Sequence, residues 1–592
     1  KKDTVSVSRA WGAVIQVGLM GAKQSCGKDD AADVTIESVE NSFETRDEIL
    51  PSTNPCKGIH DDLNSEGTFN VDVMSDVCDL EAASPAGGYS SAGTTLELPS
   101  PRNGCTLTTL MSVSTSESRR ERMSHLEVEQ EMIRGISLAA TLANRGSLWR
   151  TSPADLPQEK RAELWNKTKR VGHYDVFFSH TWRTKGSEKI LALLFQFGWH
   201  IALLLWILVA GITFALVATG LLVSPFEVEI SLLSFSDEIA YFPWIAIATA
   251  GSLIVSYMIL PYVLLLCRRP TTCFLDVVCI HQTDAINMEK GVYGLGGFLR
   301  LSEELHVLWS PPYFSRLWCV FELAAFRKAN PSKRIVINPL FAAKQTAVLI
   351  FGCYVASLIY NVLSMLHLGR TRSYIGMFMA TLPAWRCFHS IRASMQEKHA
   401  LISQLEEFDV GKAECRMQED KELILAAINH WYGSEQRFTD YVRGPLREEL
   451  LKSASSAHLP LSYAVLMCTG AWSSSLDSRA AVIQAGGPVH ALLSTSLIWL
   501  VVTFKVAWYL CDILAAPGST RLENWVRTTL VYLGTLAFFF AGFMLFMEID
   551  KMGIVGTICN AICQVALVLL VYGRYETLWC WMKEWLVKHC RI

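Results

Sequence analysis

Long uninterrupted apolar runs constrain this chain more than any other feature of its sequence. The first two cover residues 200–223 and 241–267, and each reaches the roughly 20 residues that a helix needs to span a bilayer. Charged residues make up only 18% of the chain, against about 25% in typical soluble domains. The sequence therefore predicts a membrane protein that crosses the bilayer several times.

Charges around these two runs predict their orientation. The loop between them contains Asp and Glu but no Lys or Arg. The outer flanks are basic, at Arg183, Lys185, Lys189, Arg268 and Arg269. Basic loops stay on the cytoplasmic side of a membrane, so we expect both flanks to be cytoplasmic and the acidic loop to lie on the opposite side.

Further apolar runs follow toward the C-terminus. They cover residues 345–368, 491–514, 525–546 and 554–571. A shorter piece at 373–388 either crosses the bilayer or enters it and returns. The predicted number of spans is therefore six or seven.

Four short apolar runs outside these spans have the character of β-strands. They are YDVFF at 174–178, CFLDVV at 273–278, LHVLW at 305–309 and RIVIN at 334–338. Such runs, separated by helical stretches, are typical of a parallel sheet that is covered on both faces. A two-span hairpin returns the chain to the side it left, so the first run can pair with the later ones. We predict a doubly wound α/β domain that a membrane hairpin interrupts.

The residues in and after these runs resemble the Toll/interleukin-1 receptor (TIR) domain. YDVFFSH at 174–180, FLD at 274–276 and VLWSPPYFSRLWCVFEL at 307–323 follow the order of motifs in that family. The last motif has one additional residue between its serine and its tryptophan. LDVVCIHQTD at 275–284 is also similar to the fungal heterokaryon-incompatibility domain. The resemblance implies a flavodoxin-like parallel sheet.

The resemblance also implies a site. TIR domains that are enzymes cleave NAD+ at the nicotinamide bond, and Glu322 matches the position of their essential glutamate. A carboxylate near the ribose stabilises the positive charge that develops as this bond breaks. By the same resemblance Ser179, Asp276 and Trp318 are expected to contact the nucleotide. NAD+ would be a substrate, and no cofactor is expected.

Structural roles compete with these assignments. Glu322 can instead form an ion pair with Arg316 or Arg327 on an exposed helix face. Asp276 can cap the turn that follows its strand, and Trp318 can pack beneath the helix. Three alternatives therefore stay open: a catalytic TIR-like domain, an inactive TIR scaffold, and a different fold.

Other kinds of site have little support in the sequence. The net charge is only -3, and no basic run with interleaved aromatic residues suggests a nucleic-acid partner. His281, Gln282 and Asp284 form a polar cluster, but no second pair of His or Cys lies at metal-ligand spacing. The 17 cysteines are scattered without a C-x-x-C pair, which favours reduced thiols. We expect no metal site.

These patterns together predict a membrane-anchored TIR-like signalling protein that acts by self-association of its TIR-like domain. NAD+ hydrolysis is an additional activity that the sequence leaves open. The expected partners are the lipid bilayer, further copies of the chain and other TIR-type proteins. The alternative is an ion channel or transporter with a regulatory TIR-like domain, in which Lys505 and Asp512 would face one bundle interior.

The predicted organisation follows from these segments. It comprises a disordered tail (1–115), a helical linker (116–169), the first TIR-like part (170–199), a transmembrane hairpin (200–267), the second TIR-like part (268–340), one or more spans (345–388), a helical cytoplasmic unit (389–458), further spans (459–573) and an interfacial tail (574–592).

Overall fold

The computed structural model describes residues 116–232, 235–266, 269–365, 372–453, 459–487 and 498–573. The predicted tails at 1–115 and 574–592 lie outside these residues, as does the beginning of the predicted span at 491–514. The described part of the chain is mostly helical and contains a six-stranded and a two-stranded sheet.

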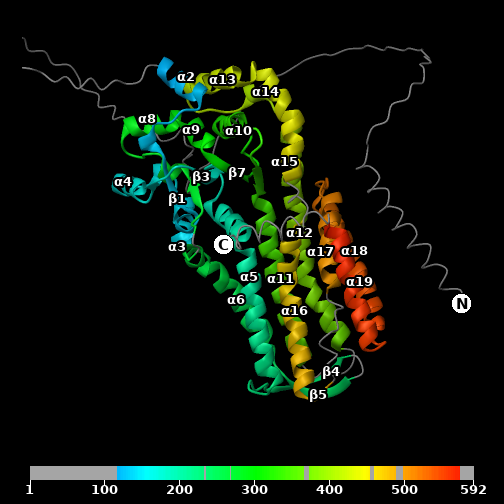
Figure 1. The fold of residues 1–592 in the computed structure, drawn as a ribbon. Helices are drawn as coiled ribbons and strands as arrows, with labels where there is room; N and C mark the ends of the chain where they lie inside the picture. The colour runs from blue at the N-terminus through cyan, green and yellow to red at the C-terminus, as the bar shows by residue number, and fades with distance from the viewer. Residues whose placement is uncertain are drawn as a thin grey trace, which may run out of the picture. The chain divides into compact units, whose positions relative to one another are not determined.

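The six-stranded sheet is mixed, with the strand order β2-β1-β6-β3-β7-β8 (Figure 1). Its strands are β1 (Arg134–Ser137), β2 (Lys169–Arg170), β3 (Tyr174–Ser179), β6 (Thr272–Phe274), β7 (Ser302–Trp309) and β8 (Ile335–Pro339). Strands β6, β3, β7 and β8 are parallel, and β1 and β2 add an antiparallel edge. The four predicted strands are therefore present, but the sheet is not wholly parallel, because the expected helical linker supplies β1 and β2.

The parallel strands form because their side chains are buried on both faces of the sheet. In β3, Tyr174, Phe177 and Phe178 are almost completely buried, and the Phe177 ring stacks on Phe274 with 4.4 Å between centroids. Strand β6 ends earlier than predicted. The Asp276 side chain accepts the amide of the next residue at 2.7 Å, a local hydrogen bond that favours a turn over an extended strand.

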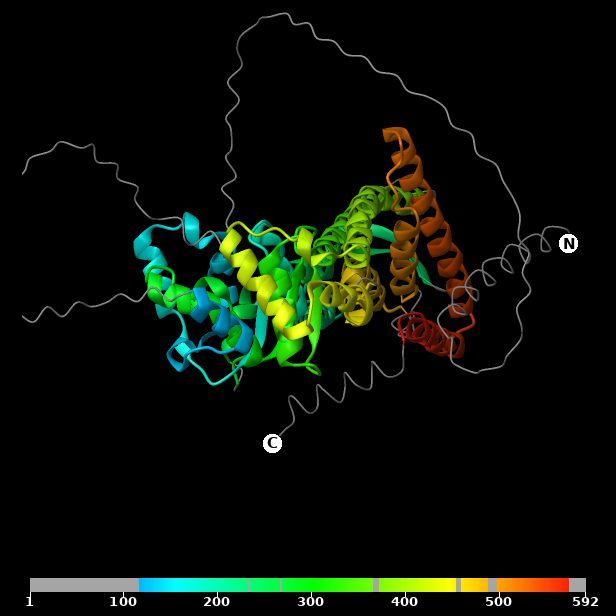
Figure 2. The same ribbon diagram turned by 90° about the horizontal axis from the view of Figure 1, so that it is seen from above.

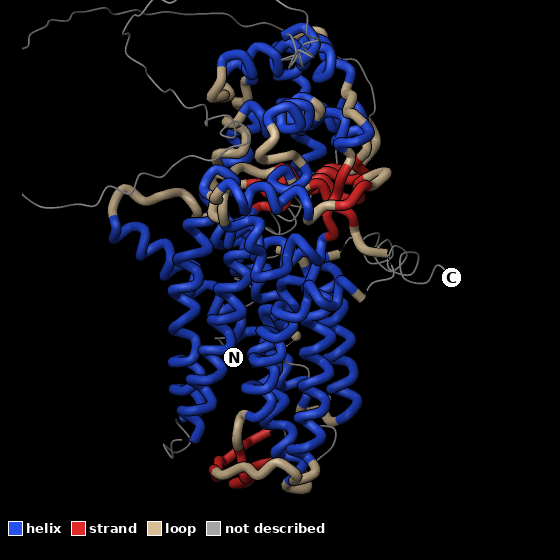
Figure 3. The backbone as a smooth tube through the Cα atoms, turned by 90° about the vertical axis from the view of Figure 1, so that its left-hand side faces the viewer, coloured by secondary structure: helices blue, strands red, loops and turns tan. Residues whose placement is uncertain are grey.

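The chain leaves the sheet between β3 and β6. This insertion consists of α5 (Gly186–Ala218), β4 (Phe226–Leu232), β5 (Phe235–Tyr241) and α6 (Trp244–Leu265). The hairpin β4–β5 lies at the opposite end of the helices from the six-stranded sheet (Figure 3). Despite the insertion, Val176 of β3 pairs with Cys273 of β6, so the two halves of the sheet meet as the sequence predicts.

The remaining long helices are α11 (Leu340–Met365), α12 (Arg372–Glu406), α16 (Leu461–Gln484), α17 (Trp499–Ile513), α18 (Arg521–Asp550) and α19 (Ile554–Tyr572). By length and composition, five described helices are able to cross a membrane: α5, α6, α11, α18 and α19. The C-terminal helices, orange to red, stand at one side of the others when the molecule is seen from above (Figure 2). The described residues thus contain fewer candidate spans than the six or seven predicted.

Helix α16 was not predicted as a span, yet it packs inside the bundle against α5, α6 and α11. Its Gly470 lies so close to α11 that an added Cβ would be 3.0 Å from the Tyr354 nitrogen. Small residues permit such close helix packing. Asp477 of α16 accepts the amides of Ile245 and Ala246 at 2.7 and 3.0 Å, so it caps α6.

Helix α12 joins two segments that the sequence analysis separates. The apolar piece at 373–388 continues without a break into the polar segment that begins at residue 389, and the helix ends at Glu406. Pro383 lies inside the helix without ending it. One helix therefore leads from the apolar bundle into the polar part of the chain.

Shorter helices cover the sheet. On the N-terminal side these are α2 (Ser116–His125), α3 (Leu138–Arg150) and α4 (Gln158–Asn166), with short 3-10 turns at Gln130–Met132 and Pro153–Asp155. Next come α7 (Asp276–Cys279), α8 (Ala285–Tyr293), α9 (Leu295–Arg300) and α10 (Leu317–Ala329). The segment after α12 adds a 3-10 turn (Val410–Lys412), α13 (Gln418–Tyr432), α14 (Glu435–Tyr441), a π-helical turn (Val442–Leu446) and α15 (Arg447–Ser453). Helix α10 packs against α9 and α13.

Candidate functional site

The candidate site lies where three neighbouring parallel strands end. Strand β3 ends at Ser179, β6 ends two residues before Asp276, and β7 ends one residue before Ser310. Because β6, β3 and β7 are adjacent and parallel, their carboxyl ends meet at one edge of the sheet. Open α/β sheets commonly bind ligands at such an edge.

Helix α10 brings Glu322 to this edge. Every residue from Leu317 to Arg327 is buried, so the helix is covered on all sides. The hydroxyl of Ser179 donates a hydrogen bond to Oε2 of Glu322. The Tyr313 hydroxyl lies 2.5 Å from Ser179 Oγ, and this produces a chain of three side chains from Tyr313 through Ser179 to Glu322.

Burial affects the protonation of the Glu322 carboxyl. Glu322 is only 6% exposed, and the removal of its carboxyl from water raises its pKa well above the ordinary value. The hydrogen bond from Ser179 opposes this rise, and the negative charge of Asp276 adds to it. Burial therefore favours the protonated form of the Glu322 carboxyl, and its described hydrogen bond is to Ser179 rather than to Arg316 or Arg327.

Asp276 lies in a second group of polar side chains at the same edge. The indole nitrogen of Trp182 donates to Asp276 Oδ2 at 2.9 Å, and His180 Nε2 lies 3.9 Å from Oδ1. His180 is buried against the ring of Trp149, with 5.3 Å between centroids. Burial, and next the charge of Lys189, lower the pKa of His180 well below its ordinary value, so the imidazole is neutral.

Trp318 has the packing role that the sequence left open as an alternative. Its side chain is 5% exposed and packs edge-on against Phe321 with ring centroids 5.7 Å apart. Its indole nitrogen has no hydrogen-bond partner within the described part of the chain. The structure thus brings Ser179, Asp276 and Glu322 to one edge and places Trp318 in the hydrophobic packing of α10.

The sequence analysis did not identify Tyr313, His180 and Trp182 as members of the site. His180 and Trp182 directly follow Ser179 at the end of β3, and residues after a parallel strand commonly face a ligand edge. Their position after the strand could therefore have identified them from the sequence. No sequence pattern identifies Tyr313, because its contact with Ser179 depends on how the segment between β7 and α10 folds back.

The chemistry open to this site is proton transfer and stabilisation of positive charge. A protonated carboxyl donates a hydrogen bond, and the same group stabilises a neighbouring cation once it ionises. Among the described residues, no three His, Cys, Asp or Glu side chains gather in a way that would hold a metal ion. The residues at the edge are instead hydroxyl, carboxyl, imidazole and indole groups.

Comparison with protein-family models, with curated proteins and with solved structures finds no match for this chain.

Proposed function

We propose that this chain is a membrane-anchored signalling protein in which a split, flavodoxin-like TIR-type domain acts by self-association and cleaves NAD+ at the nicotinamide bond. The observation that carries the proposal is the hydrogen bond from Ser179 to Glu322. These residues belong to the two motifs that most resemble a TIR domain, and they are 143 positions apart in the sequence.

The sheet topology supports the flavodoxin-like part of the proposal. If the four parallel strands are numbered along the chain, β3, β6, β7 and β8 become 1 to 4, and their spatial order is 2-1-3-4. Flavodoxin-like sheets have the order 2-1-3-4-5. The chain enters α11 directly after β8, where that fold would continue to a fifth strand.

In the proposed reaction, water replaces nicotinamide at the anomeric carbon of the ribose, and the products are ADP-ribose, nicotinamide and a proton. The bond breaks before water attacks fully, so positive charge develops on the ribose. Ionised Glu322 would stabilise that charge. Because Glu322 is only 6% exposed and burial favours its protonated form, the proposed reaction would require the site to open and admit the nucleotide.

Membrane anchoring supports self-association. The five apolar helices able to span a bilayer would confine the domains to a surface, which raises their effective concentration. The basic residues that flank the two apolar runs support a cytoplasmic position for the six-stranded sheet by the positive-inside rule. NAD+ is available in that compartment as a substrate for the site.

A channel or transporter has less support. That alternative needs Lys505 and Asp512 to face one interior. Asp512 instead accepts hydrogen bonds from Lys398 at 2.6 Å and His399 at 2.9 Å, while the Lys505 nitrogen lies 4.8 Å from the ring centre of Tyr572. The two charges therefore have separate partners.

The test is nicotinamide release by the full-length protein in liposomes supplied with NAD+. Wild type is compared with Glu322→Ala and with Glu303→Gln, whose side chain is 57% exposed at the amino end of β7. We expect turnover in wild type and in Glu303→Gln, and a loss of at least about 100-fold in Glu322→Ala. Equal turnover in all three proteins would contradict the proposal, as would no turnover by folded wild type at high surface density.

A further inference from the structure

Glu322 is buried beneath the segment that connects β7 to α10, so access to it depends on what holds that segment. The connecting segment, residues 310–316, includes Tyr313, which is fully buried and lies against Ser179. Tyr313 is thus among the side chains packed around the Ser179–Glu322 pair, and movement of this segment would expose that pair. Its contacts with the rest of the molecule therefore bear directly on activity.

One stretch of chain, residues 404–414, contacts the connecting segment along its length. We call this stretch the strap. Gln404 Nε2 donates to the Pro311 carbonyl at 2.7 Å. Farther along, the Phe408 ring packs edge-on against Phe314 with 6.3 Å between centroids. These two contacts hold the first half of the connecting segment.

Glu414 holds the second half. Its amide donates to the Ser315 carbonyl at 2.7 Å, and the Leu317 amide donates to the Glu414 carbonyl at 2.9 Å. The Glu414 carboxylate also pairs with Arg183, in the loop after β3, at 3.0 Å. The strap therefore joins the loop after β3 to the first residue of the helix that bears Glu322.

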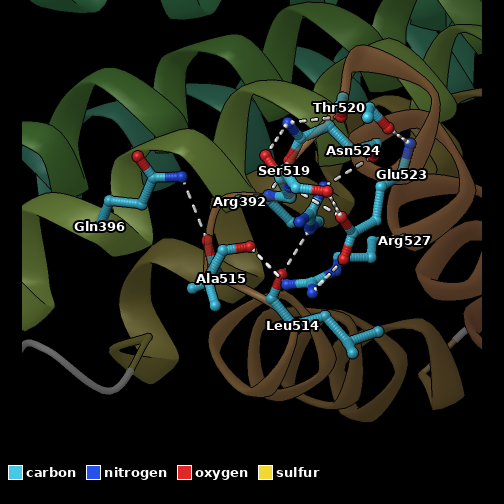
Figure 4. A network of polar contacts seen from close by, with 11 residues as sticks. Arg392, Gln396, Leu514, Ala515, Ser519, Thr520, Glu523, Asn524 and Arg527 are labelled. Carbon is cyan, nitrogen blue, oxygen red and sulfur yellow. Dashed lines mark hydrogen bonds and ion pairs between the residues drawn. The ribbon is translucent and has the colours of Figure 1, made fainter.

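The strap begins in the last turn of α12. Farther toward its N-terminus, α12 is hydrogen-bonded to the turn between α17 and α18. Arg392 Nε donates to the Leu514 carbonyl at 2.8 Å, and its Nη1 donates to the Asn524 carbonyl and to Thr528 Oγ1, both at 2.9 Å. Gln396 Nε2 donates to the Ala515 carbonyl at 3.1 Å. Figure 4 shows this network around the turn between α17 and α18.

An ion pair adds to this attachment one helical turn farther along. Lys398 Nζ and His399 Nε2 lie 2.6 and 2.9 Å from the carboxylate of Asp512, near the end of α17. Arg392 and Lys398 are 3% and 8% exposed. Charged hydrogen bonds that exclude water are stronger than exposed ones, so α12 and the α17–α18 turn are expected to move together.

A single helix connects the two attachments. Arg392 and Gln404 both belong to α12, and their separation of 12 positions corresponds to roughly 18 Å along a helix that rises about 1.5 Å per residue. A continuous helix transmits a displacement over such a length with little bending. A shift of the α17–α18 hairpin would therefore reach the strap.

We propose that α12 is a lever through which the α17–α18 hairpin regulates the Glu322 site, with the strap holding the connecting segment closed in the described arrangement. As a statement about NAD+ cleavage this rests on the proposed function, whereas the mechanical coupling stands on the contacts alone. The signal would be a rearrangement of the C-terminal helices, such as self-association in the membrane imposes.

Amide hydrogen exchange in the full-length protein in liposomes tests the coupling without reference to activity. Arg392→Gln removes the charge that holds the turn. Arg386→Gln is the matched control, because Arg386 is an exposed residue of the same helix. We expect Arg392→Gln to speed exchange by about tenfold in peptides of the α17–α18 turn and equally in those of the strap and the connecting segment. Arg386→Gln should leave all of them unchanged.

Faster exchange in the turn alone would overturn the proposal, because it would show that the attachment is lost without any effect on the strap. If Arg392→Gln does not fold, Asp512→Asn replaces it, because that change removes only the ion pair with Lys398. Amide exchange in the turn and in the strap is then compared in the same way. Nicotinamide release is then measured on the same samples. If exchange rises together in the turn and the strap but no protein releases nicotinamide, NAD+ cleavage is contradicted and the mechanical coupling stands. If nicotinamide is released but exchange in the strap does not follow the turn, the coupling is contradicted and NAD+ cleavage stands.

Discussion

Two buried carboxyl groups, one in the helical bundle and one at the edge of the six-stranded sheet, have different hydrogen-bond partners. Asp477, inside the helical bundle, is 1% exposed, and its two oxygens accept the amides of Ile245 and Ala246. Glu322, at the sheet edge, is 6% exposed, and its described hydrogen bond comes from the hydroxyl of Ser179. Asp477 thus supplies acceptors to two backbone amides in the first turn of α6, whereas the partner of Glu322 is a side-chain hydroxyl.

The difference separates a structural carboxylate from one suited to chemistry. Asp477 supplies acceptors that the first turn of α6 requires, so its removal leaves buried amides unpaired. Glu322 satisfies no backbone group in the described contacts, and in the proposed reaction its site would have to open.

Asp477→Ala should destabilise the protein by about 3 kcal/mol, because it removes a helix cap and leaves a second buried amide without an acceptor. Unfolding of the detergent-solubilised protein measures the loss. Asp477→Asn keeps one acceptor oxygen and should lose about half as much. Wild-type stability in Asp477→Ala would end the view that this residue is a structural cap.

Glu322→Gln should gain stability relative to wild type as the pH rises. The native pKa of Glu322 is raised by burial, so the unfolded chain releases this proton at a lower pH than the native protein does. Between the ordinary carboxyl pKa and the raised one, the free energy of unfolding of wild type therefore falls by up to about 1.4 kcal/mol for each pH unit. The free energy of unfolding of Glu322→Gln has no such contribution, because its amide does not titrate. Unfolding at pH 5, 6 and 7 measures this, and parallel curves for both proteins would show that Glu322 is not held protonated.

Tyr313→Phe should destabilise the α/β unit by about 1 kcal/mol, since it removes the hydroxyl that lies 2.5 Å from Ser179. Tyr509→Phe is the control, because Tyr509 is 61% exposed and should tolerate the change. Both variants are measured by unfolding at neutral pH. Equal changes in the free energy of unfolding of the two variants would mean that the Tyr313 hydroxyl has no special role in closing the site.

Glu303→Gln should change stability by less than about 0.5 kcal/mol. Its carboxylate pairs with Lys333 at 3.2 Å, but both side chains are partly or largely exposed, and such pairs contribute little. Unfolding under the same conditions checks this. A loss as large as that of Tyr313→Phe would mean that the contrast between buried and exposed carboxylates is weaker than described.

The parallel part of the sheet could be predicted from the sequence because each of its strands is an apolar run bounded by polar residues. The antiparallel edge could not. Strand β1 has four residues, RGIS, and β2 has the two residues KR, so neither contains the alternation or the apolar run that identifies a strand. Both strands exist only because they pair with β6 and with each other.

Two further features were missed for physical reasons. Helix α16 lies in the bundle although Ser, Thr, Asp and Arg lower its hydropathy. Asp477 and Ser474 have hydrogen-bond partners on neighbouring helices, and Thr469 and Ser478 donate to carbonyls of α16 itself.

At the site, the structure brings together Ser179, Asp276 and Glu322, which the sequence singles out for nucleotide contact and catalysis, and that role stays a prediction. The pairing of Tyr313 with Ser179 depends on the fold of one loop, which a local pattern does not specify.

The most direct test of the account is nicotinamide release by wild type, Glu322→Gln and Asp477→Asn in the same liposomes, with turnover expressed per folded molecule. The account predicts that Glu322→Gln loses turnover by at least about 100-fold. Asp477→Asn, although less stable, should keep nearly all of it. Loss in both variants alike, or turnover that survives in Glu322→Gln, would contradict the claim that Glu322 is the catalytic carboxylate and Asp477 a structural one.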